Sequence, residues 1–140
     1  MIDGPLLILL VAVLIVGILI FIAMSATKKR SHTFDKEEYQ IDFKKIENTL
    51  TSENELSYNT VVVSADKLLD KALCEMGVPG RNMGDRLKAS KDKFSQLNSV
   101  WYVHKLRNQI AHEHGFQLDY HQANRSLATF RQALKDLGAI

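Results

Sequence analysis

The chain has 140 residues, of which 46% are hydrophobic and 24% are charged, and its formal net charge is +2. Two prolines and seven glycines exclude collagen-like and other Pro/Gly-rich chains, and one cysteine excludes an internal disulfide framework and a Cys-rich zinc site. All 18 basic and 15 of the 16 acidic side chains follow residue 26, which gives that part a net charge of +3. This excess is too small to indicate a nucleic-acid binder by charge alone, and the length allows one small core.

The first predicted element is a membrane anchor over residues 1–26. Residues 5–24 carry no charge and are rich in Leu, Ile and Val. A helix rises about 1.5 Å per residue, so this run spans about 30 Å, the thickness of the hydrocarbon core. We therefore expect residues 5–24 to contact membrane lipid. A cleaved signal peptide is the alternative, but that would have a basic n-region and a shorter apolar region.

The flanks of this run predict its orientation. Lys28, Lys29 and Arg30 follow it directly, and no basic residue precedes it. The positive-inside rule then places the C-terminal domain in the cytoplasm and the N-terminus outside the cell. We expect a single-pass protein of the cell (inner) membrane, and a reducing cytoplasm suits the free Cys74.

The pattern after the anchor is helical, so the predicted fold class is all-α: one transmembrane helix followed by a bundle of four to five helices. Residues 27–52 form a juxtamembrane tether and an accessory helix that starts at Phe34-Asp35 and carries an apolar stripe at the spacing i, i+4, i+7, i+11. Residues 53–140 form the main helical domain, and its short loops favour antiparallel neighbours. The stripe of the accessory helix consists of Tyr39, Phe43, Ile46 and Leu50.

Capping residues set the expected bounds of the later helices. These helices are one from the capping box Ser52–Glu55 to Met76, a short one over residues 83–90, one over residues 96–114 capped by Ser95, and one capped by Asp119 and Gln122 that ends at Leu137.

The helix over residues 96–114 holds most of the side chains that could do chemistry. At 100° per residue, one arc carries an apolar set that we expect to face the core. His104, Asn108 and His112 recur every four residues on another arc, and Arg107 and His114 lie on its flank. The apolar set is Tyr102, Val103, Leu106 and Ile110.

A cation, an amide and imidazoles on one helix suit phosphodiester chemistry. Arg107 offers donors that match phosphate oxygens, and a histidine can accept and give a proton near neutral pH. RNA carries its own nucleophile, the 2′-hydroxyl, so a base, an acid and a phosphate clamp could cleave it without a metal. Asn108 could orient an imidazole or bind a phosphate oxygen.

Structural interpretations of the same residues stay open. Arg107 could pair with Glu113 or with an acid of the last helix, and His112 could serve as a residue favoured by the helix dipole. His104 could be an ordinary surface histidine. A zinc site from His112, His114 and His121 is conceivable, although no H-E-x-x-H motif is present. Neither a Gly-rich phosphate loop nor a nucleophile elbow is found.

Residues 107–112 (RNQIAH) resemble the R-x(4–6)-H motif of HEPN domains (higher eukaryotes and prokaryotes nucleotide-binding), in which a polar residue commonly follows the Arg. Residues 65–87 resemble the long first helix and following turn of such domains, and residues 123–137 resemble the last helix. The resemblance covers about residues 53–138. The anchor and the accessory helix do not belong to the usual domain.

The resemblance implies a helical bundle that forms a homodimer, in which two motif helices build a composite cleft. Many members are metal-independent endoribonucleases, often toxins or antiviral effectors, that leave a 2′,3′-cyclic phosphate. If the roles of the motif residues apply to this chain, Arg107 would stabilise the phosphate, Asn108 would orient the imidazole, and His112 would transfer a proton. His104 and His114 lie outside the motif, and from their place on the helix we expect them to bind substrate. We expect no metal and no cofactor.

Two functions therefore remain as predictions. The first is a membrane-anchored cytoplasmic endoribonuclease of toxin or defence type, with RNA as substrate and an antitoxin or another protein as partner. The alternative is a non-catalytic HEPN-like dimerisation and binding module that acts as a scaffold at the inner membrane surface. A purely structural tethered bundle is the third hypothesis.

Overall fold

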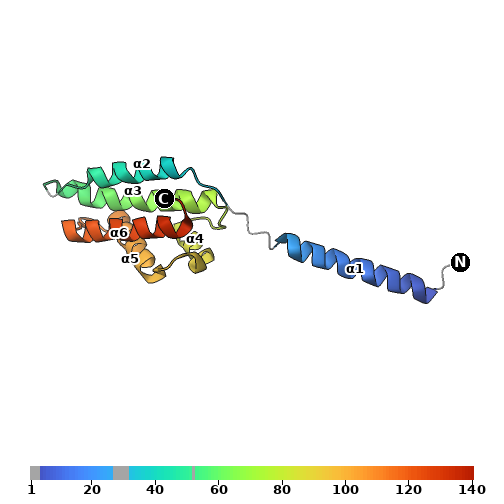
Figure 1. The fold of residues 1–140 in the computed structure, drawn as a ribbon. Helices are drawn as coiled ribbons and strands as arrows, with labels where there is room; N and C mark the ends of the chain where they lie inside the picture. Colours follow the sequence, from blue (N-terminus) through green and yellow to red (C-terminus); the bar gives the residue numbers. More distant parts are fainter. Residues whose placement is uncertain (1–3, 27–31, 52) are drawn as a thin grey trace. The chain divides into compact units, whose positions relative to one another are not determined.

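The computed structural model describes residues 4–26, 32–51 and 53–140, and all regular structure in these ranges is helical (Figure 1). The all-α prediction is confirmed. The chain divides into two compact units, Met1–Ser31 and His32–Ile140.

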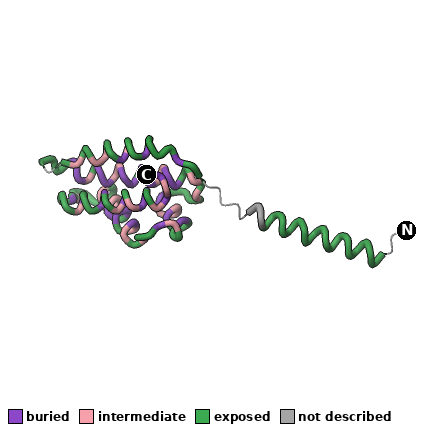
Figure 2. The backbone as a smooth tube through the Cα atoms, in the orientation of Figure 1, coloured by how far each residue is buried: buried purple, intermediate pink, exposed green. Residues whose placement is uncertain are grey.

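The first unit contains one helix, α1 (Gly4–Ala26). Its stretch Gly4–Ala23 is long and apolar enough to cross a membrane, and none of it is buried against other parts of the chain (Figure 2). A helix satisfies its own backbone hydrogen bonds, which is the condition for a segment to enter lipid. A helix with these properties is equally typical of a signal sequence near an N-terminus.

The second unit begins with α2 (Lys36–Thr49), close to the expected accessory helix. Asp35 caps it, because its carboxylate accepts a hydrogen bond from the backbone N–H of Glu38 at 3.1 Å. Tyr39 and Phe43 are buried as the stripe predicted. The face that they form packs on α3, so α2 shares the core of the main domain.

The long helix α3 (Glu55–Glu75) is the centre of this unit, because it contacts α2, α4, α5 and α6 (Figure 1). It begins two residues later than a helix capped by Ser52 would, so the predicted cap was wrong. Asn54 is the cap and accepts from the backbone N–H of Leu56 at 3.1 Å, whereas Ser52 lies outside the described residues. The largest fully buried side chains of α3 are Val61, Val62, Leu69 and Leu73.

Three further helices complete the bundle: α4 (Met83–Ala89), α5 (Leu97–His112) and α6 (Tyr120–Leu137), with a 3₁₀ turn, η1 (Lys91–Lys93), before α5. The reciprocal capping box of Asp119 and Gln122 is confirmed at the start of α6. Helix α5 ends two residues earlier than expected. Gly138 ends α6 with a φ of 78°, a conformation that glycine adopts without the penalty of a Cβ atom.

The expected cap of α5 is wrong, because Ser95 is bound elsewhere. Its backbone N–H and its hydroxyl both donate to the Asp136 carboxylate of α6, at 2.8 and 2.7 Å. Gln132 donates to the same carboxylate at 2.9 Å. Gln96 takes the N-cap position of α5 without a side-chain hydrogen bond. Asp136 therefore ties the segment before α5 to α6.

These bonds make the stability of the fold depend on pH. Burial raises the pKa of Asp136, but the hydrogen bonds from Gln132 and Ser95 outweigh it and hold the pKa below its ordinary value. A carboxyl group whose pKa is lowered by folding stabilises the folded state when ionised, and this contribution is lost as the pH falls through the folded-state pKa.

We expect Asp136→Asn to lower the free energy of unfolding by about 1–2 kcal/mol at pH 7, because an amide accepts weaker hydrogen bonds than a carboxylate. Urea unfolding of wild type and variant at several pH values measures this. The difference should shrink as the pH falls below about 4, because the carboxyl group of the unfolded wild type is protonated there and that of the folded protein follows at lower pH. A difference that stays constant down to pH 2 would contradict the role given to the charge.

Candidate functional site

A buried acid on α3 and a buried histidine on α5 form the centre of the candidate site. Asp66 is 3% exposed and His104 is 8% exposed. The Nδ1 atom of His104 lies 2.9 Å from the Asp66 Oδ1 atom. Since the carboxylate can only accept, the imidazole donates through Nδ1–H. A buried carboxylate is costly unless it is paired, and this contact supplies its first partner.

Two further side chains of α5 complete a network around this pair. The Nε atom of Arg107 lies 3.5 Å from the Asp66 Oδ2 atom, an ion-pair distance without a hydrogen bond. Arg107 donates through Nη1 to the Asn108 Oδ1 atom at 3.2 Å, and the Asn108 Nδ2 atom lies 3.3 Å from the His104 Nε2 atom. The network therefore holds the Arg-Asn pair of the sequence motif against α3.

A cleft of about 660 Å³ opens beside the network, between α3, α4 with the loop before it, and α5. Five of its lining side chains are basic and three are acidic. The cleft is therefore suited to an anion of small-molecule size. The basic residues are Lys67, Arg81, Arg86, Lys88 and Arg107, and the acidic ones are Asp66, Asp70 and Asp85.

A second ion pair forms the wall of the cleft one helical turn after Asp66. Asp70 accepts two hydrogen bonds from Arg86 of α4, at 2.6 and 2.9 Å, and this hydrogen bonding raises the pKa of Arg86. Arg86 also donates to the Gly80 carbonyl at 2.7 Å. A Cβ atom on Gly80 would lie 2.8 Å from the backbone nitrogen of Arg86, so the loop approaches α4 too closely for a larger residue. These contacts fix α4 beside α3.

The structure brings some of the predicted site residues together and leaves others apart. Arg107, Asn108 and His104 all line the cleft. His112, the last residue of α5, and His114, which follows the helix, are exposed and do not line this cleft.

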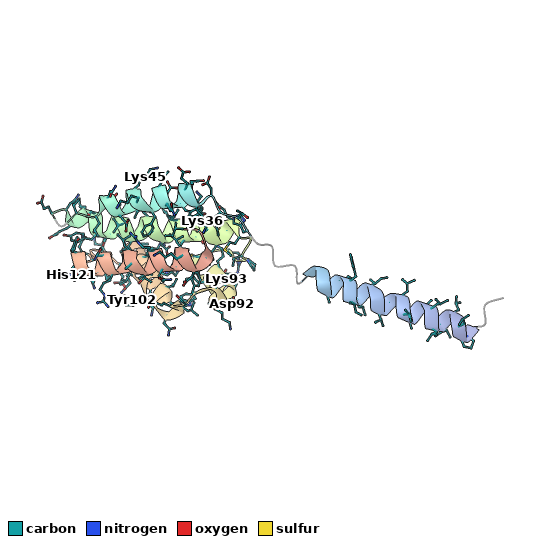
Figure 3. All side chains as sticks on the ribbon, in the orientation of Figure 1. Lys36, Lys45, Asp92, Lys93, Tyr102 and His121 are labelled. Atoms are coloured by element: carbon teal, nitrogen blue, oxygen red, sulfur yellow. The ribbon has the colours of Figure 1, made fainter. Side chains whose placement is uncertain are left out.

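The prediction of the two faces of α5 was partly wrong. Val103 and Leu106 are buried and Ile110 is partly buried, as expected. Tyr102, however, is 57% exposed, and Figure 3 shows it at the surface of the domain. His104 was expected on a different arc from the core face but is buried, with Asp66 of α3 as its partner.

The sequence left open a pair between Arg107 and Glu113 and a zinc site, and the contacts of the described residues bear on both. Glu113 accepts a hydrogen bond from Gln109 at 3.2 Å, and the ion-pair partner of Arg107 is Asp66. Among the described residues, no three His, Cys, Asp or Glu side chains are grouped so as to hold a metal ion.

Asp66 is the main residue that the sequence reasoning missed. It lies 38 residues before His104, so no local motif joins them. A signal was nevertheless present, because Asp66 follows Val62 by four residues and precedes Leu69 by three, which places an acid within an apolar stripe. A charged residue at a core position of a helix indicates a buried partner.

Comparison of the chain with protein-family models, with curated proteins and with solved structures finds no match.

We expect the two acids of α3 to differ in their effect on stability. Asp66→Ala leaves His104 and Arg107 without their buried partner and should lower the free energy of unfolding by about 3 kcal/mol. Asp70→Ala removes a partner from a more exposed pair and should lower it by about 1 kcal/mol. Urea unfolding followed by circular dichroism measures both. Equal losses, or a larger loss for Asp70→Ala, would show that the Asp66 network is not the main polar contact of the core.

Proposed function

We propose that the chain is a membrane-anchored HEPN-like protein that cleaves RNA without a metal ion, using Arg107, Asn108 and His112. One observation carries this proposal: the adjacent Arg107 and Asn108 line a cleft with more basic than acidic side chains, and a buried network holds them there. A guanidinium in such a place is suited to a phosphodiester, because its planar donors match two phosphate oxygens.

The parts of the reaction follow from the chemistry of these side chains. Arg107 stabilises the negative charge that develops on the phosphate, and Asn108 orients a neighbouring group or binds a non-bridging oxygen. His112 transfers a proton to the leaving oxygen. RNA supplies the nucleophile through its 2′-hydroxyl, so the products are a 2′,3′-cyclic phosphate and a 5′-hydroxyl. Base-reading motifs are absent from the sequence, so RNA is proposed as a class of substrate without a preferred sequence.

The position of His112 supports a homodimer as the active form. His112 is exposed at the end of α5 and lies outside the cleft that holds Arg107 of the same chain. In a two-fold dimer, each surface patch contacts its own copy or the reciprocal patch of the partner. A dimer that joins the exposed side of α5 would bring His112 of one chain toward Arg107 of the other. A composite cleft of this kind also agrees with the small size of the domain.

The alternative is a binding module without catalysis, which serves as a scaffold at the inner membrane surface. The same cleft favours it, since a basic cleft can bind a phosphate group without any proton transfer from His112. A protein partner, such as an antitoxin for a toxin of this kind, belongs to either function. Cleavage assays on matched variants separate the two.

We expect full-length protein in detergent to cut single-stranded RNA in the presence of EDTA. Arg107→Ala should lower kcat/KM by about 10²–10³-fold, as loss of an electrostatic stabiliser does, and His112→Ala by about 10²–10⁴-fold, as loss of a proton-transfer group does. Gel analysis of labelled oligoribonucleotides measures both, with the products tested for a cyclic phosphate. His121→Ala is the matched control, because His121 lies exposed on α6 (Figure 3) and does not line the cleft.

RNA binding by a verified dimer without cleavage would favour the scaffold. Cleavage that persists in both Arg107→Ala and His112→Ala would show that a contaminating nuclease is responsible. Equal loss of activity in His121→Ala would show that the effect is one of folding.

The proposed location is the cell membrane, with α1 as a single span, the N-terminus outside and the helical domain in the cytoplasm. The span length of α1 supports the anchor, and the basic residues 28–30 support the orientation.

The location is tested by reporters fused after Ile140. A reporter that is active only in the cytoplasm should be active, and a reporter that is active only outside should be silent. Replacing residues 28–30 with Gln should reduce this bias, because the positive charges set it. A protein released in soluble form without residues 1–26 would show that α1 is a cleaved signal sequence.

A further inference from the structure

The contact with Asp66 fixes the tautomer of His104. Because Nδ1 donates its proton to the carboxylate at 2.9 Å, the other ring nitrogen, Nε2, is the acceptor in the neutral imidazole. Asp66 is 3% exposed, so this hydrogen bond is shielded from water. An acid that holds a histidine in one tautomer and orientation is the arrangement by which enzymes prepare an imidazole to accept a proton.

The acceptor atom of His104 faces the cleft. His104 lines the cleft, and its side chain keeps 10% of its surface exposed. Gly84 of α4 lies opposite, and a Cβ atom there would be 3.9 Å from Nε2. A residue larger than alanine at this position would therefore reach the space beside Nε2. Glycine has a cost inside a helix, and here it leaves the imidazole open toward the cleft.

The neighbours of Nε2 connect it to Arg107. The Asn108 amide approaches Nε2 at 3.3 Å and accepts from Arg107 through its oxygen at 3.2 Å. A phosphate bound by the Arg107 guanidinium would therefore lie near Nε2, and an adjacent 2′-hydroxyl could replace the Asn108 amide there. The Trp101 ring meets the imidazole edge-on, with ring centroids 6.1 Å apart, and restricts its rotation.

From these observations we propose that His104, oriented by Asp66, is the general base that accepts the proton of the RNA 2′-hydroxyl. This inference rests on the proposed ribonuclease function and adds the group that starts the reaction. Asp66 is a positioning residue, because it acts through His104. The sequence motif contains neither of them.

The 2′-hydroxyl gives its proton to the His104 Nε2 atom, and its oxygen forms a bond to phosphorus. The bond from phosphorus to the 5′-oxygen breaks, and that oxygen takes a proton from the acid, His112 of a second copy. The cyclic phosphate and the 5′-hydroxyl leave, after which exchange with water returns both histidines to their starting states. The reaction consumes no other reactant.

The charges around His104 come from each helix that borders the cleft. They are Asp66, Lys67 and Asp70 from α3, Arg81 from the loop before α4, Asp85, Arg86 and Lys88 from α4, and Arg107 from α5. Asp70 and Arg86 are bound to each other. The charged groups within the His104 network are therefore Asp66 and Arg107.

The test is the pH dependence of kcat/KM for full-length protein in detergent, with a labelled single-stranded oligoribonucleotide in EDTA. Wild-type activity should fall at acidic pH, where the base is protonated, and at alkaline pH, where the acid has lost its proton. His104→Asn keeps an amide donor near the position of Nδ1 for Asp66 but removes Nε2. It should lower kcat/KM by about 10²–10⁴-fold and abolish the acidic fall.

Three further variants separate the roles. His112→Asn should abolish the alkaline fall and leave the acidic one. Asp66→Asn should lower kcat and leave KM unchanged, because the imidazole loses the carboxylate that holds its tautomer and orientation. His121→Asn, on α6, should keep the wild-type rate and profile. Circular dichroism confirms folding of each variant before its profile is compared.

Binding is measured separately, by fluorescence anisotropy with an oligonucleotide of 2′-deoxy sugars that cannot be cut. His104→Asn should bind it as the wild type does. A folded His104→Asn variant that keeps the wild-type rate and acidic fall would overturn the inference and leave the ribonuclease function standing. So would a loss of activity that equals its loss of binding. Failure of the wild-type protein to cleave any RNA would overturn both.

Discussion

The buried carboxylate of Asp66 is the constraint on which the arrangement of the other helices depends. An ionised group inside a helical core is unfavourable until charged or polar partners surround it. Helix α3 presents this group to α5, and His104 and Arg107, three residues apart on α5, both reach it. A rotation of α5 by one residue would remove both contacts at once. The acid therefore sets the register of the motif helix more sharply than its apolar contacts do, since apolar packing tolerates similar side chains in several arrangements.

The same face of α3 explains why a cleft exists beside the motif. Asp70 follows Asp66 by one turn and holds Arg86 of α4 through two hydrogen bonds. Two acids at the spacing i, i+4 thus fix two different helices, α5 and α4, against one central helix. The short helix α4 stays beside α5, with Gly84 at the point where a side chain would fill the space. The cleft therefore follows from the polar contacts that position α4 beside α5.

Much of the fold could be predicted from the sequence because local rules determine it. The stripe of Tyr39 and Phe43 and the capping box of Asp119 and Gln122 each depend on residues a few positions apart. Ser95 shows the limit of such rules, because a residue 41 positions away competes for its hydrogen bonds. Tyr102 shows another limit, since the helical period assigns an arc and leaves open which neighbours cover it.

The same limit applies to the site: contacts between neighbours in the sequence could be predicted, and contacts between distant residues could not. Arg107 and Asn108 are adjacent, so the sequence could place them together, and the cleft contains both. The partner of His104 lies 38 residues earlier in the sequence, and only the packing of α3 on α5 reveals it.

His112 stands apart from this network, at the end of α5, where a positive charge is favourable. The two histidines of α5 thus have different surroundings, one held by a carboxylate and one exposed at a negative helix end. In the proposed reaction, the imidazole held with its free nitrogen toward the cleft accepts a proton, and the exposed imidazole gives one. Because His112 does not line the cleft that holds His104 of the same chain, the proposed reaction uses a second copy of α5 to bring the two histidines to one substrate.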